Sequence, residues 1–310
     1  MLSHQPFLII AGTYRAGTTA LFSHLSRHPE VMPARYKELA FFFSDRWNED
    51  PPLFPPGQEA ETYLASFHSK PGGRVLMEAT PNYLHDPGCA ERIRHALPEA
   101  KMVVLLRDPI DRLRSWFRHS QYQGRLPAGL RFDDWVDGLF ADERPLQERP
   151  YMQRALEHGR YAAYVGELID VFGPDRVLVA WFDDLGRAPR RLVEQVCTFA
   201  GISPTLLPAE ELAPVNEAMR MPRPRLYNRY LRLCRRALDV FGRWPRLRHR
   251  AQAIVYAPEP AIRRRLSLPA DPVDVRAETM AALERYYEQD IAPLEAVVGA
   301  EVPWAARWRG

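Results

Sequence analysis

The hydrophobic residues of this chain alternate between short continuous runs and longer segments with a helical period. Continuous apolar runs bounded by turn residues predict buried strands at 7–11, 74–78, 101–107 and 177–182. Helical spacing predicts helices after Gly17, near 59–67, at 89–97, after Pro109, near 132–140, through Phe172, and at 189–200 and 278–298. Four strands separated by helices are typical of an α/β fold whose parallel sheet is covered by helices on both faces.

The junction between the first strand and the first helix has the features of a phosphate-binding loop. Gly12 and Gly17 let the backbone approach a ligand closely, and Arg15 places a cation inside the loop. The first amides of a helix have no partner within it, and the helix dipole adds partial positive charge there. The Thr18 and Thr19 hydroxyls can also bind phosphate oxygens. The pattern predicts an anion site, although a glycine-containing turn that binds nothing would look the same.

The same loop differs from the Walker A loop of nucleotide hydrolases and kinases. The spacing of the two glycines fits, but Thr18 stands where the lysine that reaches the β- and γ-phosphates belongs. The cation is Arg15 instead, which suits a ligand with a single 5′-phosphate and a transferable group beyond it. A P-loop small-molecule kinase is therefore the second choice among enzymes.

Composition sets further limits on the function. The chain has 310 residues, three widely spaced cysteines without a Cys-x-x-Cys pattern, and a net charge of +3. It can bury a full core, and we expect neither a disulfide framework, a thiolate zinc site nor a nucleic-acid partner. The strand that starts near residue 7 and the absence of a long apolar run predict a cytoplasmic protein without a leader or a membrane span.

The loop resembles the 5′-phosphosulfate loop of sulfotransferases that use 3′-phosphoadenosine-5′-phosphosulfate (PAPS), written Lys or Arg, any residue, Gly-Thr-Thr. Here the matching residues are Arg15, Ala16, Gly17, Thr18 and Thr19. The resemblance implies a P-loop-like sheet, binding of PAPS without a metal, and release of adenosine 3′,5′-bisphosphate (PAP). It also implies that Arg15 contributes to catalysis.

A second element is the charged pair that precedes an aromatic run. Lys37-Glu38 with Phe41-Phe42 looks like the Lys-Glu and Phe-Phe element of heparan-sulfate-type and bacterial sulfotransferases, except that Leu39 replaces a frequent proline. The resemblance implies that Glu38 is the general base. The alternative is an ordinary exposed ion pair on a loop.

A third element follows the predicted strand at 74–78. The Glu-x-Ser/Thr-Pro-x-Tyr pattern recurs in sulfotransferases, and here Glu78, Thr80 and Tyr83 occupy it. Because ligands of open parallel sheets bind at the carboxyl ends of strands, these residues are predicted to line the acceptor side or to orient the base. A plain strand-to-turn boundary explains the pattern nearly as well. His85 is predicted to be an ordinary surface histidine.

A fourth element ends the strand at 101–107. Sulfotransferases have Arg-x-Pro, then Arg, then Ser at this place, and the segment from Arg107 to Ser115 matches it. The resemblance implies that Arg107 and Ser115 bind the 3′-phosphate, a task that suits the planar fork of arginine. An isolated Arg-Asp-Pro turn also serves as a plain helix start, but two anion loops in this order strengthen each other.

These observations lead to one overall prediction. We expect a single sulfotransferase domain over 1–310, with a core at about 5–205, an Arg-rich helical segment at about 218–258 and a C-terminal helix at about 276–298. The acceptor would be a carbohydrate, lipid or natural product, bound in part by the insertion at 121–150. The Arg-rich segment, which holds eleven arginines and one acidic residue, fits a solvated face, a patch for an anionic acceptor or membrane surface, or a lid. A non-catalytic nucleotide-binding or membrane-surface module is the alternative outside the enzymes.

Overall fold

The computed structural model describes residues 5–44, 60–123, 125–127, 129–141, 154–208 and 273–308, and a few isolated positions between 219 and 269. The chain divides into two compact units. The first comprises Met1–Leu113, Arg149–Asn216 and Met280–Gly310, and the second comprises Arg114–Glu148 and Glu217–Thr279. Whether the two units together form the predicted single domain over 1–310 depends on their arrangement, so the single domain stays a prediction.

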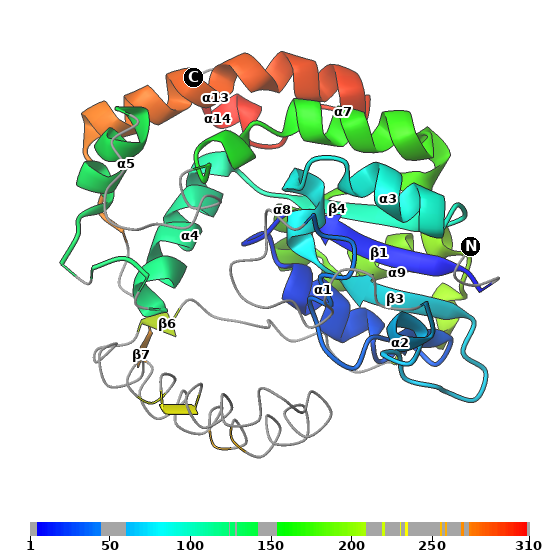
Figure 1. Cartoon of the computed structure of the whole chain (residues 1–310). Helices are drawn as coiled ribbons and strands as arrows, with labels where there is room; N and C mark the ends of the chain where they lie inside the picture. Colours follow the sequence, from blue (N-terminus) through cyan, green and yellow to red (C-terminus); the bar gives the residue numbers. More distant parts are fainter. Residues whose placement is uncertain are drawn as a thin grey trace. The chain divides into compact units, whose positions relative to one another are not determined.

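A parallel sheet forms the centre of the first unit (Figure 1). Its five strands lie in the order β2-β3-β1-β4-β5. Their bounds are β1 Phe7–Gly12, β2 Val31–Pro33, β3 Val75–Ala79, β4 Lys101–Leu106 and β5 Val177–Trp181. The four predicted strands are present, and β2 is an additional short strand. Three residues that end in proline carry too little periodicity to be recognised as a strand.

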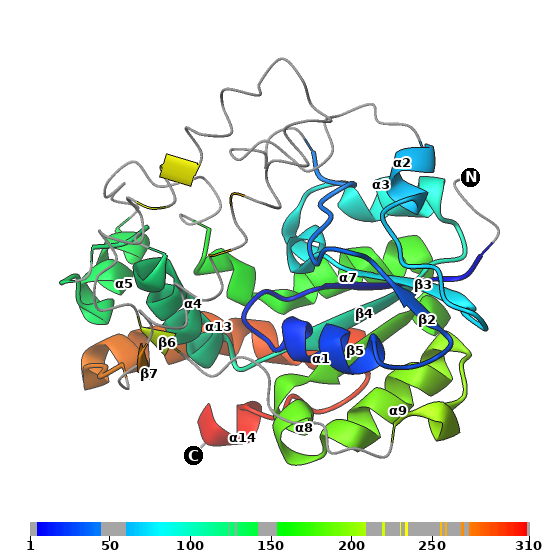
Figure 2. The same cartoon turned by 90° about the horizontal axis from the view of Figure 1, so that it is seen from below.

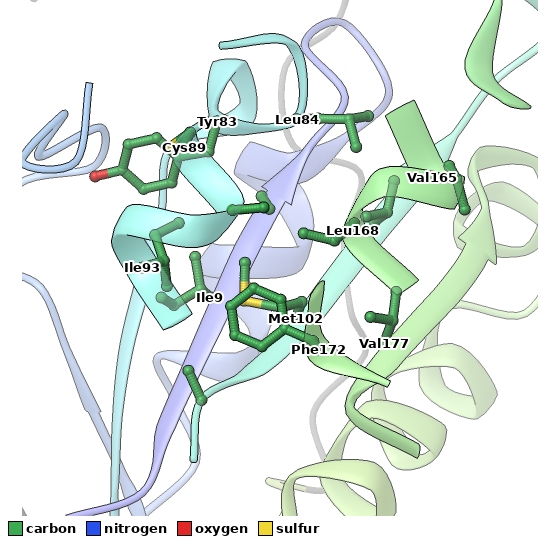
Figure 3. Packing of buried hydrophobic residues seen from close by; sticks show 14 of the residues in the cluster. Ile9, Tyr83, Leu84, Cys89, Ile93, Met102, Val165, Leu168, Phe172 and Val177 are labelled. Carbon is green, nitrogen blue, oxygen red and sulfur yellow. The ribbon is translucent and has the colours of Figure 1, made fainter. Parts of the chain in front are cut away.

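Helices cover both faces of this sheet (Figure 2). On one face α1 (Thr18–Leu25) and α9 (Pro189–Ala200) pack against Leu8 and Ile10. On the other face α3 (Cys89–Ala96) and α7 (Tyr161–Phe172) enclose Ile9 and Met102, as Figure 3 shows. Neighbouring residues of β1 thus enter different cores, which explains why the whole strand is apolar. The predicted P-loop-like α/β class is confirmed.

The C-terminal helix α13 (Ala277–Val298) adds to the core beside α7. Its residues Ile291 and Leu294 are buried there, and the Tyr287 hydroxyl donates a hydrogen bond to the Leu156 carbonyl over 2.9 Å. Although α13 has 22 residues, none of the described helices is both long and apolar enough to cross a membrane. The presence of α13 confirms the predicted helical C-terminal part.

The remaining elements are short connections and the helices of the second unit. Their bounds are α2 Ala60–Leu64, η2 Pro81–His85, α4 Pro109–Tyr122, α5 Phe132–Phe140, η3 Glu157–Gly159, η4 Pro174–Arg176, α8 Phe182–Arg187, η5 Pro204–Leu206, β6 Met219–Arg220, β7 Leu268–Pro269 and α14 Ala305–Trp308. In the second unit Phe117 of α4 packs against Phe132 and Trp135 of α5. Most of the Arg-rich segment 218–258 and about a third of 121–150 lie outside the described residues, so their predicted roles stay predictions.

Candidate functional site

The predicted site residues of the first unit follow the carboxyl ends of neighbouring strands. In the parallel sheet β3 and β4 pair with β1 on its two sides, with Ile10 opposite Ala79 and Val103. The segments that leave these strands therefore meet at one edge. This edge brings together the phosphate loop after β1, the Glu78 segment at the end of β3, and Arg107 after β4.

The phosphate loop ends in a left-handed glycine at the start of α1. Gly17 is the N-cap with a φ of 84°, and no side chain caps the helix. A Cβ atom on Gly17 would lie 2.6 Å from Cδ2 of Leu185 and 3.0 Å from Cδ2 of Phe182. Glycine is thus required both by its φ and by the close packing of α8. The uncapped helix start leaves its first amides suited to an anion.

Arg107 connects the end of β4 to this loop. Its Nη1 donates a hydrogen bond to the Arg15 carbonyl over 3.2 Å, and its guanidinium lies 4.4 Å from the centre of the Phe182 ring. Burial lowers the pKa of Arg107, but an arginine stays charged at neutral pH. Arg15 itself has a φ of 66° and a half-buried side chain. Two arginines predicted to bind different phosphates are therefore linked directly.

The start of α4 shows a role for the aspartate of the Arg-Asp-Pro motif. Asp108 Oδ1 accepts hydrogen bonds from the amides of Ile110 (2.9 Å) and Asp111 (3.2 Å), and Oδ2 pairs with Arg307. Burial and the charge of Asp111 raise the pKa of Asp108 to about 6. Asp108 is thus a helix cap. Ser115 lies further along α4, half-buried and within the second unit, and its predicted contact with the 3′-phosphate stays a prediction.

Glu38 lies in a strained turn beside β3. Its amide donates a hydrogen bond to the Ala79 carbonyl over 2.9 Å, and both Glu38 (φ 68°) and Ala40 (φ 57°) have left-handed backbones. The Glu38 side chain is 59% exposed, and its Oε1 lies 2.6 Å from Nζ of Lys37. Leu39 and Phe42 are buried in the core, so the predicted docking of the aromatic run is confirmed. The turn holds the carboxylate at the surface while its neighbours anchor it.

Glu78, by contrast, is completely buried at the end of β3. Its carboxylate accepts hydrogen bonds from the hydroxyls of Tyr63 (2.6 Å), Thr80 (3.1 Å) and Tyr83 (3.4 Å). Burial raises the pKa of Glu78 to about 7, although the three hydroxyl donors oppose this shift. Tyr63 carries no motif and was missed, because its contact with Glu78 depends on the packing of α2 against the sheet.

The hydroxyls bound to Glu78 also hold the Glu38 turn. The Thr80 hydroxyl accepts a hydrogen bond from the Ala40 amide, and the Tyr83 hydroxyl accepts one from the Phe42 amide, each over 3.3 Å. Since Glu78, Thr80 and Tyr83 are all at most 3% exposed, their contacts lie within the protein. These contacts fit the predicted role of orienting the base, and both predicted roles, this one and lining the acceptor side, stay predictions.

The prediction that His85 is a surface residue is wrong. His85 ends η2 and is 2% exposed, because this turn folds back against the end of β1. Its Nε2 lies 2.9 Å from Oγ1 of Thr13, and its ring stacks on that of His158 at 4.3 Å. A polar residue shortly after a Pro-containing turn gives no local signal of burial, so the sequence pattern did not reveal this pair.

The described residues contain no group of three or more His, Cys, Asp or Glu side chains that could hold a metal ion. The expectation that no metal takes part stays a prediction. Charged groups at this edge of the sheet include the cations Arg15 and Arg107 and the acidic Glu38.

Comparisons with known proteins agree with this geometry. A sequence model described as the sulfotransferase family matches residues 6–205. The chain is similar to bifunctional heparan sulfate N-deacetylase/N-sulfotransferase 4 of Mus musculus, with 26% identity over 208 residues, 65% of this chain and 23% of that protein. It is also similar to bifunctional heparan sulfate N-deacetylase/N-sulfotransferase 3 of Homo sapiens, with 27% identity over 210 residues, 64% of this chain and 22% of that protein.

The chain thus spans less than a quarter of the length of these curated relatives. Among solved structures, a sulfotransferase from Alicyclobacillus acidocaldarius has a TM-score of 0.68 and 24% identity, and the match covers 99% of this chain and 100% of that one. At this identity the likeness shows the fold.

Proposed function

The chain belongs to the sulfotransferase family, and from this premise we propose that it moves a sulfuryl group from PAPS to a hydroxyl or amine of an acceptor. The proposal rests on one observation: two arginines lie beside the start of a helix that no side chain caps. The Arg107 side chain donates a hydrogen bond to the carbonyl of Arg15, which lies two residues before the N-cap Gly17. An exposed carboxylate, Glu38, is held at the neighbouring strand end. A cationic, amide-rich loop beside an accessible base is what this transfer requires.

The residues present fit the anionic cofactor. We assign the amides of Ala16–Thr19 and the guanidinium of Arg15 to the 5′-phosphate side, and Arg107 with Ser115 to the 3′-phosphate. Helix-start amides and arginine forks are the donors that phosphate oxygens prefer. When bound, PAPS supplies the sulfuryl group and PAP as the leaving group. We propose that no metal is needed, because the cations at this edge come from the protein itself.

Glu38 is proposed as the general base. Its carboxylate takes the proton from the acceptor hydroxyl or amine, whose lone pair then forms the new bond to sulfur. The Lys37 ammonium, 2.6 Å from Glu38 Oε1, holds that carboxylate in one orientation. Arg15 and the loop amides stabilise the negative charge that develops on the phosphate side of the breaking bond.

The acceptor class is also part of the proposal. A carbohydrate, lipid or natural product fits the family, and a glycan is supported by the relatives, which are named for heparan sulfate. We further propose a bacterial, cytoplasmic enzyme whose Arg-rich segment at 218–258 contacts an anionic acceptor or a membrane surface.

Thermal unfolding with PAP and with ATP plus Mg²⁺ tests the cofactor assignment. Stabilisation by PAP is the expected result, whereas stabilisation by ATP-Mg²⁺ alone would support a P-loop kinase. Transfer of labelled sulfate from PAPS to a panel of glycan, lipid and small-molecule acceptors then tests the reaction. A protein that ignores both nucleotides would support the non-catalytic alternative.

Calorimetric titration of Arg107→Ala sharpens the assignment. If Arg107 binds the 3′-phosphate, this variant loses about 1.5 to 3 kcal/mol of the preference for PAP over adenosine 5′-monophosphate. Arg176→Ala is the matched control, because Arg176 pairs with Glu99 at the surface. An undiminished preference in Arg107→Ala would contradict the assigned role.

A further inference from the structure

Two histidines from distant segments hold consecutive residues of the phosphate loop. His85 Nε2 lies 2.9 Å from Oγ1 of Thr13, and His158 Nδ1 lies 3.0 Å from the hydroxyl of Tyr14. His85 ends η2, which follows β3, and His158 lies in η3, which precedes α7, so the two residues come from segments 73 positions apart in the sequence. All four side chains are buried, with at most 8% of any of them exposed.

The two rings form one unit. They are stacked at a centroid distance of 4.3 Å with an angle of 11° between their planes. Tyr164 of α7 packs edge-on against both rings, and its hydroxyl donates to Glu157 over 3.3 Å. A shift of one ring therefore requires the other ring and Tyr164 to move.

Burial, and after it the cations around the pair, favour the neutral form of both rings. The Arg112 guanidinium lies 4.8 Å from the centre of the Tyr14 ring. Burial first, and then the nearby charges of Arg112 and Arg154, hold the pKa of His85 well below the usual range. The pKa of His158 is also held well below it, by burial first, then by His85 and the same two arginines. A neutral imidazole has one donor and one acceptor nitrogen, so each ring can give the loop one directed hydrogen bond. Two neutral rings can also stack without repulsion.

We propose that His85 and His158 are positioning residues that hold Thr13 and Tyr14, and through them Arg15, in the conformation that binds the 5′-phosphosulfate group. This inference rests on the proposed function. Thr13 and Tyr14 directly precede Arg15, whose left-handed φ of 66° is one that a non-glycine residue seldom adopts. A loop that is already ordered does not lose conformational freedom when the anion binds, which raises the affinity.

Calorimetric titration with PAP tests the proposal on His85→Gln and, separately, on Thr13→Val. Thr13→Val removes the hydrogen bond, and His85→Gln removes the imidazole ring that makes it and that stacks on His158. Each variant is expected to raise the Kd for PAP about tenfold. The double variant should bind about as weakly as either single variant, because the two side chains share one contact.

The matched control is His28→Gln. His28 is also fully buried, and its Nε2 bonds to the Ser203 carbonyl at 2.8 Å, away from the phosphate loop. This variant should lower the melting temperature but leave the Kd for PAP within about twofold. If His85→Gln, Thr13→Val and the corresponding variants of the second contact, His158→Gln and Tyr14→Phe, all bind PAP as well as His28→Gln does, the two histidines are merely structural and the proposal is overturned.

Hydrogen exchange separates this proposal from the proposed function. In the protein without nucleotide, exchange at the amides of residues 13–17 should be faster in His85→Gln and Thr13→Val than in the parent and in His28→Gln. A parent that does not bind PAP would contradict the proposed function, and the exchange rates would still test the histidines. Unchanged exchange in both loop variants would overturn their positioning role.

Discussion

Two glutamates at neighbouring parts of the sheet edge experience opposite environments. Glu38 is 59% exposed and pairs with Lys37, whereas Glu78 is completely buried and accepts hydrogen bonds from three hydroxyls. The two segments are joined, since the Glu38 amide donates to the carbonyl of Ala79, the residue after Glu78. Identical side chains are thus placed for different tasks.

The comparison shows that one glutamate supplies a solvent-accessible carboxylate and the other helps to keep the turn that carries it in one conformation. The Glu38 side chain is exposed to solvent but lies in a turn with two left-handed residues, and such backbone positions are costly unless neighbours hold them. Glu78 cannot reach solvent, but it orients the Thr80 and Tyr83 hydroxyls that bind the Ala40 and Phe42 amides. We infer that the buried glutamate organises the turn that carries the exposed one.

The largest expected effect comes from Glu38→Gln. Sulfuryl transfer should fall about a hundredfold or more, the usual scale for loss of a general base, while the Kd for PAP stays near that of the parent. Steady-state kinetics and calorimetry measure the two quantities. Glu61→Gln, at an exposed position of α2, serves as the control. Unchanged turnover would remove Glu38 from the mechanism.

The second prediction concerns the pH dependence of stability. Burial raises the pKa of Glu78 to about 7, so the folded protein binds more protons than the unfolded chain between about pH 4.5 and 7. The contribution of Glu78 to the free energy of unfolding is therefore lost as the pH rises through this window. Between pH 5 and 8 the parent should lose about 2 kcal/mol relative to Glu78→Gln.

Urea unfolding of both proteins at several pH values provides the measurement. Because every other titrating group is common to the two proteins, the difference between them isolates Glu78. A difference that stays constant with pH would mean that Glu78 has an ordinary pKa, and the contrast with Glu38 would be lost.

The third prediction is that Glu78→Gln lowers turnover about tenfold without changing the Kd for PAP, because the Thr80 and Tyr83 hydroxyls lose part of their orientation and the turn becomes looser. A purely structural role would lower the melting temperature and leave turnover per folded molecule unchanged. Glu78→Asp, which keeps the charge but not the reach, should recover little activity.

The smallest effects are expected from removing one hydroxyl at a time. Thr80→Val removes the acceptor for the Ala40 amide, and Tyr83→Phe removes that for the Phe42 amide. Each should lower turnover about threefold and cost about 1 kcal/mol of unfolding free energy. Tyr63→Phe removes a donor to Glu78 without touching the turn directly. A larger loss of turnover for Tyr63→Phe than for Thr80→Val and Tyr83→Phe would contradict the proposal that the Thr80 and Tyr83 hydroxyls hold the turn directly.

Much of the fold follows from local patterns in the sequence. The continuous apolar run at 7–11 and the change to helical spacing at Gly17 predict β1, the turn that follows it and α1, and all three are present. The Lys101 run and Pro109 likewise predict β4 and the start of α4. These features depend on residues close together in the chain, whose spacing is visible in the sequence.

The tertiary structure alone decided which polar side chains are buried and what they bind. Tyr63 and Glu78 are 15 residues apart, Thr13 and His85 are 72 apart, and Tyr14 and His158 are 144 apart. Each of these contacts forms because a helix or turn packs against a strand end or loop that is distant in the sequence, so no local pattern predicts it. The sequence by itself thus determined the elements and the candidate loop, and the packing of the sheet decided how the loop and the Glu38 turn are held.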